Sequence, residues 1–160
     1  MPVKTLVLQA SPQDAPLLAR LHAHCFDKAW DAEAMATFIR GPGTVCLIGF
    51  AGDDSPMPGG LLIARSAADE AELLTIGVAP ACRHLGLGRA LLAHAVAALA
   101  AVGTKRFFLE VDETNDAAIA LYHAIGAKPV GRREGYYESG AAAAIFSLDL
   151  ESCPLPVTPR

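Results

Sequence analysis

The chain has 160 residues, which is enough for one globular domain with its own hydrophobic core. Of these residues 52% are hydrophobic and 19% charged, a composition too apolar for a disordered chain. Its formal net charge of −4 argues against broad electrostatic binding, so we expect no nucleic-acid partner. No apolar run approaches the roughly 20 residues that span a bilayer, and the start MPVKTLVLQA suits a strand better than a signal peptide, so we expect a cytoplasmic protein without a membrane partner.

The N-terminal half predicts a strand, two helices and then three strands. A loosely alternating stretch at residues 4–9 precedes Ser11-Pro12-Gln13-Asp14, where serine caps a helix, proline fits its first turn and aspartate completes a capping-box pattern. A second helix begins at Asp31. The strands that follow are residues 44–50, 60–64 and 72–78, and the turn-rich GDDSPMPG makes the first two a hairpin.

The C-terminal half alternates helices and strands. In chain order it predicts a helix at residues 87–102 ended by Gly103, a strand at 106–111, a helix capped by Asn115 and ended by Gly126, and strands near 128–133 and 142–150. The whole order predicts an α/β fold with a single mixed central sheet of about seven strands and four helices. We expect one domain over residues 1–150 and a flexible C-terminal tail over residues 151–160.

A glycine-rich, basic loop separates the strand at residues 72–78 from the next helix. It consists of Arg83, His84, Leu85, Gly86, Leu87, Gly88 and Arg89. The first N–H groups of a helix lack internal partners, glycines let an anion approach them, and arginines add charge-assisted bonds, so the loop predicts a phosphate site. It is not a P-loop, which needs Lys-Ser/Thr after the second glycine, and Leu91 weakens a dinucleotide fingerprint. Glycines that merely permit tight packing are the alternative.

The motif R-x-x-G-x-G, preceded by V-A-P and followed by R-A-L-L, resembles the acetyl-CoA pyrophosphate loop of the GCN5-related N-acetyltransferases, the GNAT superfamily. Within it, CFDKAWDAEAM, FFLEVDETNDAAIALYHAIGA and GRREGYYE resemble segments of the ribosomal-protein-alanine (RimI-like) N-acetyltransferases. Asp112 and Ala127 depart from that pattern, which usually has Arg and Phe there. The resemblance implies a GNAT fold, an N-acetyltransferase domain over residues 1–150, acetyl-CoA as co-substrate, and a cleft for it where the fourth and fifth strands splay apart.

Two residues at matching positions would carry the chemistry. By resemblance, Glu110 would deprotonate the acceptor amine and Tyr122 would protonate the departing thiolate. A strand-end ion pair is the alternative for Glu110, and a core position is the alternative for Tyr122, which forms a helical stripe with Ile119 and Ile125.

Further residues would bind the two substrates. Asn115 and Tyr122 would contact acetyl-CoA by resemblance. Backbone groups of Ile76, Gly77 and Val78 would hold its pantetheine arm, with a bulge at Gly77 splaying the strand. The candidates for the acceptor groove are Trp30, Glu72, Tyr136 and Tyr137. The cysteines (Cys25, Cys46, Cys82 and Cys153) lack zinc-ligand spacing, so we expect free thiols and no metal.

The choice of acceptor amine follows partly from basicity. An α-amine has a pKa of about 7.7–8.0 and lysine about 10.4, so one glutamate base suffices for the former. With the resemblance, this predicts direct acetyl transfer from acetyl-CoA to a protein or peptide N-terminus, by analogy the alanine of a ribosomal protein. A small-molecule amine acetyltransferase of the same fold and a non-catalytic acyl-CoA-binding module are the alternatives.

Overall fold

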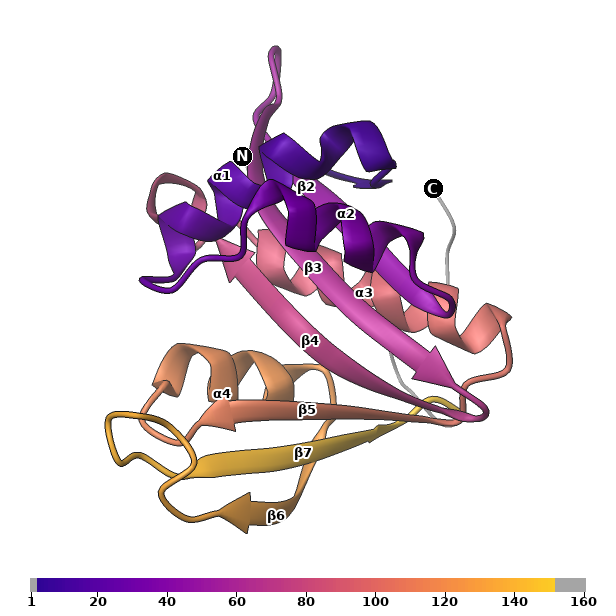
Figure 1. Ribbon diagram of the computed structural model, residues 1–160, viewed down its shortest axis with the longest axis vertical. Helices are drawn as coiled ribbons and strands as arrows, with labels where there is room; N and C mark the ends of the chain where they lie inside the picture. The colour runs from indigo at the N-terminus through magenta and orange to yellow at the C-terminus, as the bar shows by residue number, and fades with distance from the viewer. Residues whose placement is uncertain (1–2, 152–160) are drawn as a thin grey trace.

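A seven-stranded sheet runs through the computed structural model, which describes residues 3–151 (Figure 1). Its strand order is β1-β2-β3-β4-β5-β7-β6. The elements are β1 (Thr5–Gln9), α1 (Ala15–Cys25), α2 (Ala32–Arg40), β2 (Thr44–Ala51), β3 (Met57–Ala67), β4 (Glu70–Val78), α3 (Leu87–Ala101), β5 (Arg106–Asp112), α4 (Asp116–Ala124), β6 (Lys128–Arg133) and β7 (Ala143–Asp149). The predicted element order and mixed sheet are confirmed. Most of the predicted tail, residues 152–160, lies outside the described residues, as does Cys153.

Local capping signals place the helices. The Asp14 carboxylate accepts hydrogen bonds from the Ser11 N–H at 2.8 Å and hydroxyl at 3.0 Å, although the first turn is a short 3₁₀ helix and α1 begins only at Ala15. The Asp31 carboxylate accepts from the Ala34 N–H at 2.9 Å and starts α2. Gly103 and Gly126 adopt positive φ after α3 and α4, as glycine readily does at a helix end.

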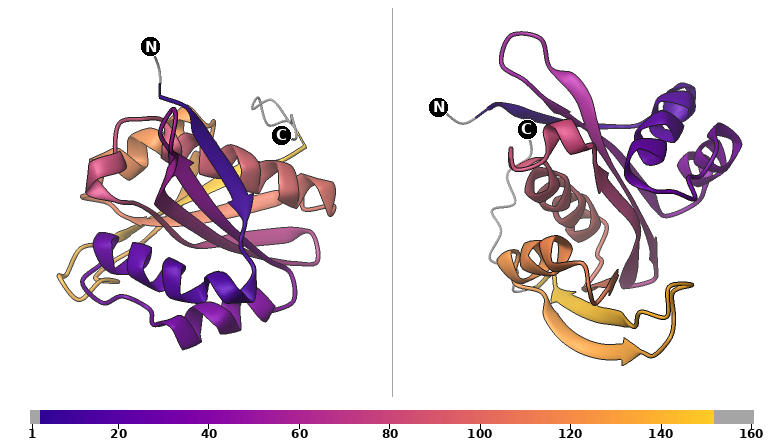
Figure 2. Two further views of the ribbon diagram at one scale, coloured as in Figure 1. Left: turned by 90° about the horizontal axis from the view of Figure 1, so that it is seen from above. Right: turned by 90° about the vertical axis from the view of Figure 1, so that its left-hand side faces the viewer.

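The sheet lies between two pairs of helices, α1 with α2 on one face and α3 with α4 on the other (Figure 2). Successive residues of β3 point to opposite faces. Leu61 and Ile63 therefore join the core under α1 and α2, whereas Leu62 and Ala64 join the core under α3. Since both faces are covered, β3 is a nearly continuous apolar strand.

The strands β4 and β5 pair in parallel over only three residues each, Glu70–Glu72 with Arg106–Phe108, and then diverge (Figure 1). The irregularity that accompanies the divergence is at Leu74, which is the extra residue of β4 between the β3 partners Ile63 and Ala64. The predicted splay is confirmed.

The predicted bulge at Gly77 is wrong, because Gly77 pairs regularly with Leu61 of β3. Glycine is needed there for close packing under the end of α1. A Cβ atom would lie 2.9 Å from the Cys25 Sγ atom and 3.2 Å from Cε2 of Phe26.

Candidate active site

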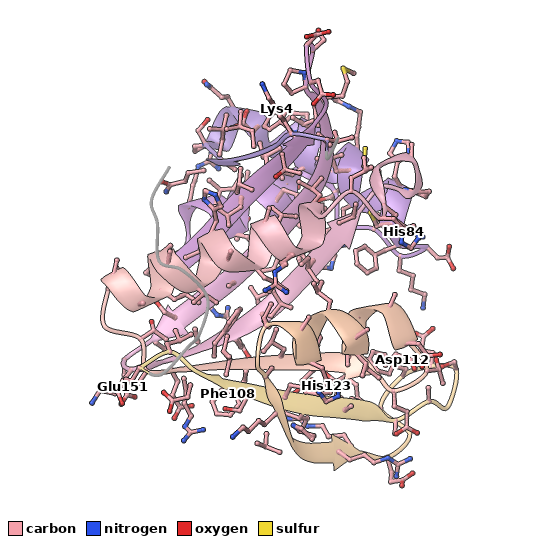
Figure 3. The ribbon with its side chains drawn as sticks, turned by 180° about the vertical axis from the view of Figure 1, so that it is seen from behind. Lys4, His84, Phe108, Asp112, His123 and Glu151 are labelled. Carbon is pink, nitrogen blue, oxygen red and sulfur yellow. The ribbon has the colours of Figure 1, made fainter. Side chains whose placement is uncertain are left out.

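Four loops gather at the end of the sheet where β4 and β5 diverge. They are the α1–α2 loop (residues 26–31), the glycine-rich loop before α3 (79–86), the β5–α4 loop (113–115) and the β6–β7 loop (134–142). Figure 3 shows His84 and Asp112 at this end of the molecule and Glu151 at the opposite end. An ion pair of 2.6 Å between Lys28 Nζ and the Glu138 carboxylate links the α1–α2 and β6–β7 loops.

The glycine-rich loop has the backbone of an anion site. His84 and Gly86 adopt positive φ angles of 65° and 85°, and a Cβ atom at Gly86 would meet nothing within 4 Å. Leu87 starts α3 but is 1% exposed, so only its backbone can face a ligand. A Cβ at Gly88 would lie 3.2 Å from Leu121 of α4. Tight packing thus accounts for Gly88, whereas open access accounts for Gly86.

Two exposed guanidinium groups flank this helix start. Arg83 Nε donates to the Val78 carbonyl at 3.0 Å, and Arg89 Nη1 donates to the Ala124 carbonyl at 3.3 Å. Neither side chain is in an ion pair within residues 3–151, so both positive charges remain to meet an anion. His84 is exposed beside them and Leu85 packs partly against the core.

The strand edge beside the loop is open toward β5. Ile76, Gly77 and Val78 pair with β3 on one side, whereas the pairing of β4 with β5 has ended at Glu72. Backbone groups along this edge are therefore available to an extended ligand, as the pantetheine prediction requires.

Glu110 lies on β5 beyond the last pair with β4. Its neighbours Leu109 and Val111 are buried in the α3 core, so Glu110 points to the other face of the sheet. Its carboxylate lies 3.4 Å from Arg133 Nη2, and its side chain is 32% exposed. The predicted alternative of an ion pair is therefore present, but it leaves the carboxylate accessible.

An open cavity of about 460 Å³ lies on this face of the sheet. The cavity is lined by Arg65, Ala67, Ala68, Asp69, Glu70, Ala71, Glu72, Phe108, Glu110, Arg133 and Ile145. It joins Glu110 to the predicted acceptor residue Glu72, whose carboxylate pairs with Arg65 at 2.7 Å.

Tyr122 is 2% exposed on α4 and packs edge-on against Phe146, with ring centroids 5.8 Å apart. Burial raises the pKa of Tyr122, and the nearby Tyr137 raises it further, so the phenol stays protonated at neutral pH. The predicted core position of Tyr122 beside Ile125 is confirmed. A core position is compatible with a role as general acid, because the buried hydroxyl keeps its proton. Its catalytic role stays a prediction.

The two tyrosines of the β6–β7 loop differ in their surroundings. Tyr137 is half-buried, and burial raises its pKa, which the negative charges of Glu110 and Asp112 raise further. Tyr136 is 51% exposed and lies under the Arg133 guanidinium, 5.4 Å from the ring centroid. Tyr137 is therefore the inner residue of the pair and Tyr136 the outer one.

Asn115 and Trp30 each have a structural role. The Asn115 side-chain oxygen caps α4 by accepting from the Ala118 N–H at 3.1 Å, as predicted, and this leaves the amide N–H groups for a ligand. Trp30 does not line the cavity around Glu110; its ring stacks on His22, with centroids 4.8 Å apart, and packs at a tilt against Phe38, at 4.7 Å. Its predicted contact with the acceptor stays a prediction.

Two residues of this region were not predicted from the sequence to belong to the site. Arg133 precedes the tyrosine pair and bridges Glu110 to Tyr136, a position that the R-x-x-Y-Y pattern marks. His22 is buried, and its spacing of four residues from Leu18 on α1 was the signal that places it on the inner helix face.

Within residues 3–151, no helix has the length and hydropathy of a membrane span. The same residues contain no group of three or more His, Cys, Asp or Glu side chains arranged to hold a metal ion. Cys25, Cys46 and Cys82 are free thiols.

Comparison with known proteins matches residues 15–127 to the family model described as "Acetyltransferase (GNAT) family". An N-alpha-acetyltransferase RimI of Mycobacterium tuberculosis is 36% identical over 149 residues, covering 85% of this chain and 87% of the relative. A [Ribosomal protein bS18]-alanine N-acetyltransferase of Escherichia coli is 43% identical over 75 residues, 47% of this chain, and the match spans 51% of that relative's length. The crystal structure of the ribosomal-protein-S18-alanine N-acetyltransferase from Escherichia coli superimposes with a TM-score of 0.81 at 27% identity, covering 92% of this chain and 94% of that one.

Proposed function

The chain belongs to the acetyltransferase (GNAT) family, and we propose that it moves the acetyl group of acetyl-CoA onto the α-amine of a protein N-terminus. The observation that carries the proposal is the divergence of β4 and β5 after Glu72 and Phe108. It leaves a free strand edge and a glycine-rich helix start for an acyl donor, and it exposes Glu110 on the opposite face to an acceptor.

The donor side is built from groups that suit the two parts of acetyl-CoA. The N-terminus of α3, the open Gly86 and the unpaired charges of Arg83 and Arg89 suit its phosphates. The edge of β4 suits its extended amide-containing arm. Asn115 lies at the start of α4 to contact the same substrate. Acetyl-CoA supplies the activated acyl carbon and a thiolate leaving group.

The chain's own residues then move two protons. Glu110 accepts a proton from the attacking amine, directly or through a water molecule. The amine nitrogen forms a bond to the acyl carbon as the carbon–sulfur bond breaks, and Tyr122 donates its proton to the sulfur. Glu110 then releases its proton to solvent and the tyrosinate regains one from solvent, which returns both groups to their starting states. Because burial keeps Tyr122 protonated, it is an acid and not a second base.

The names of the relatives support an N-terminal alanine as the acceptor. One is named for the α-amine and another for the alanine of a ribosomal protein, and we propose the same class of acceptor for this chain. The lower basicity of an α-amine, with a pKa of about 7.7–8.0, supports it over a lysine side chain for a site with one glutamate base.

Thiol release from acetyl-CoA tests the proposal. The acceptors are peptides that begin with Ala, Ser, Gly or Met, compared with spermidine and free amino acids. Release with the alanine peptide supports the proposed function. Release only with the small amines would make the protein a small-molecule acetyltransferase, and no release despite acetyl-CoA binding would make it a binding module.

A further inference from the structure

The buried imidazole of His22 joins the α1–α2 loop to the central sheet. His22 is 3% exposed, its Nδ1 lies 3.0 Å from the Trp30 backbone nitrogen, and its Nε2 lies 3.3 Å from the Thr75 hydroxyl. A backbone N–H can only donate, so Nδ1 is the acceptor and carries no proton. Neutral imidazole then carries its proton on Nε2 and donates to Thr75. The geometry therefore assigns both the charge state and the tautomer of His22.

Two aromatic rings stack on the same imidazole. The Phe26 ring stacks on it with centroids 4.4 Å apart, and the Trp30 ring stacks on it at 4.8 Å. Trp30 in turn packs on Phe38 of α2 at 4.7 Å. Phe26 and Trp30 lie near the two ends of the α1–α2 loop, so the conformation of the loop depends on the ring they share.

Thr75 lies in β4 between the bulge and the candidate acyl-donor edge. It pairs with Ile63 directly after the extra residue Leu74 and directly before Ile76, the first residue of the candidate acyl-donor edge. It is also buried, at 8% exposed. A hydrogen bond to Thr75 therefore links the loop on the acceptor side to the segment of strand that faces the donor.

We propose that His22 is a positioning residue, whose neutral imidazole fixes the α1–α2 loop to Thr75 of β4 and so sets the affinity of the site for its acceptor. The effect on the acceptor rests on the proposed function, whereas the link between His22, Trp30 and Thr75 does not. His22 touches neither reacting group, since its imidazole is buried between Phe26, Trp30 and Thr75.

Protonation breaks this link. A proton on Nδ1 would face the Trp30 N–H, another donor, so the imidazolium cannot keep both hydrogen bonds. Titratable neighbours along the chain are His24 and Cys25 on α1 and Asp27 and Lys28 in the loop. Burial is the cause that lowers the pKa of His22, and within the described residues no charged side chain of α1, α2, β4 or the loop adds to it. The link therefore holds at neutral pH and breaks in acid.

Tryptophan fluorescence tests the link without either substrate. Trp30 is the chain's only tryptophan, and a protonated imidazole quenches a stacked indole. We expect one emission transition with a midpoint below pH 6.5, abolished by His22→Gln and retained by the matched control His24→Gln, which changes an exposed histidine two residues away. Absence of the transition in the unmodified protein, or its survival in His22→Gln, would overturn the proposal.

Steady-state kinetics test the consequence for the acceptor. Thr75→Val removes the hydroxyl and keeps the side-chain shape, and Thr104→Val is its control because the buried Thr104 hydroxyl has no partner in residues 3–151. We expect Thr75→Val to raise the KM for the acceptor about tenfold, the effect of about 1.4 kcal/mol, while kcat and the KM for acetyl-CoA change less than about twofold. Thr75→Ser should restore the acceptor KM, and Thr104→Val should leave it unchanged.

Two kinetic results would overturn the positioning role: an unchanged acceptor KM in Thr75→Val, or an equal rise in the KM of both substrates. If no peptide is acetylated at all, the proposed function fails, but the fluorescence titration still decides whether His22 holds the loop.

Discussion

Glu72 of β4 and Phe108 of β5 form the last pair between these two strands, and two residues further along β5 Glu110 has a partner only on β7. This relationship creates the site. The divergence opens one edge of β4 to the donor and leaves the Glu110 carboxylate facing a cavity on the opposite side of the sheet. The proposed acetyl transfer takes place at this gap, where the donor at the edge of β4 meets the acceptor in the cavity beside Glu110.

Glu110→Gln should lower kcat by about 10²-fold or more, because an amide cannot accept the amine proton. The ion pair with Arg133 is partly exposed, so its loss should change stability by less than about 1 kcal/mol. Stopped-time thiol release and thermal unfolding measure the two effects. Glu113→Gln is the matched control, since Glu113 also pairs with an arginine of β6, Arg132. Equal kcat values for the two variants would exclude Glu110 as the base.

Tyr122→Phe should lower kcat by about 10²-fold and leave acetyl-CoA affinity and folding intact, because the ring still packs against Phe146. Burial raises the pKa of Tyr122 above its usual value of about 10, so the unmodified enzyme should show no loss of rate from this group up to that pH. A kcat profile to pH 10 checks this. The control is Tyr136→Phe, which alters an exposed hydroxyl. An active Tyr122→Phe would assign the residue to packing alone.

Substitutions at Asn115 should separate its two roles. Asn115→Ala removes the cap on α4 and should cost about 1 kcal/mol, or about 2–4 °C in Tm for a chain of this size. Asn115→Asp keeps a capping oxygen but brings a negative charge and no N–H donor, so stability should be retained while acetyl-CoA binding weakens. Calorimetric melting and acetyl-CoA titration measure these quantities separately. Unchanged binding in Asn115→Asp would restrict the residue to capping.

The unfolding free energy should decrease as the pH falls below about 6.5. Burial lowers the pKa of His22 in the folded state, so the unfolded chain binds that proton first and gains stability relative to the folded chain in this range. The decrease should continue until the pH passes below the folded-state pKa. Urea unfolding at pH 7.5, 6.5 and 5.5 measures it. His22→Gln should flatten the dependence between these values, and an unaltered slope in that variant would contradict the burial of a neutral imidazole.

Elements with local signals could be predicted from the sequence. Ser11 and Asp14 form the expected capping box, Asn115 caps α4, and Gly103 ends α3, because each signal involves residues within one turn. The open backbone at Gly86 also follows from local glycine chemistry. The resemblance added the divergence of β4 from β5, which no local pattern determines.

Long-range register and packing could not be predicted in this way. The bulge lies at Leu74 and not at Gly77 because its position depends on how β4 pairs with β3. Glycine is needed at position 77 because Cys25 and Phe26, which are distant in the sequence, pack against it. Likewise, the contact of His22 with Thr75 joins residues that are 53 positions apart. A helix pattern indicates that His22 faces inward, but only the packed structure identifies its partner.

The most direct test of the proposed activity is an internal competition within one acceptor. A peptide with a free N-terminal alanine and an internal lysine is incubated with acetyl-CoA near pH 7, and fragmentation mass spectrometry locates the added acetyl group. We predict acetylation of the α-amine and no reaction of the same peptide with a blocked N-terminus. Acetylation of the lysine, or equal reaction of the blocked peptide, would contradict transfer to a protein N-terminus.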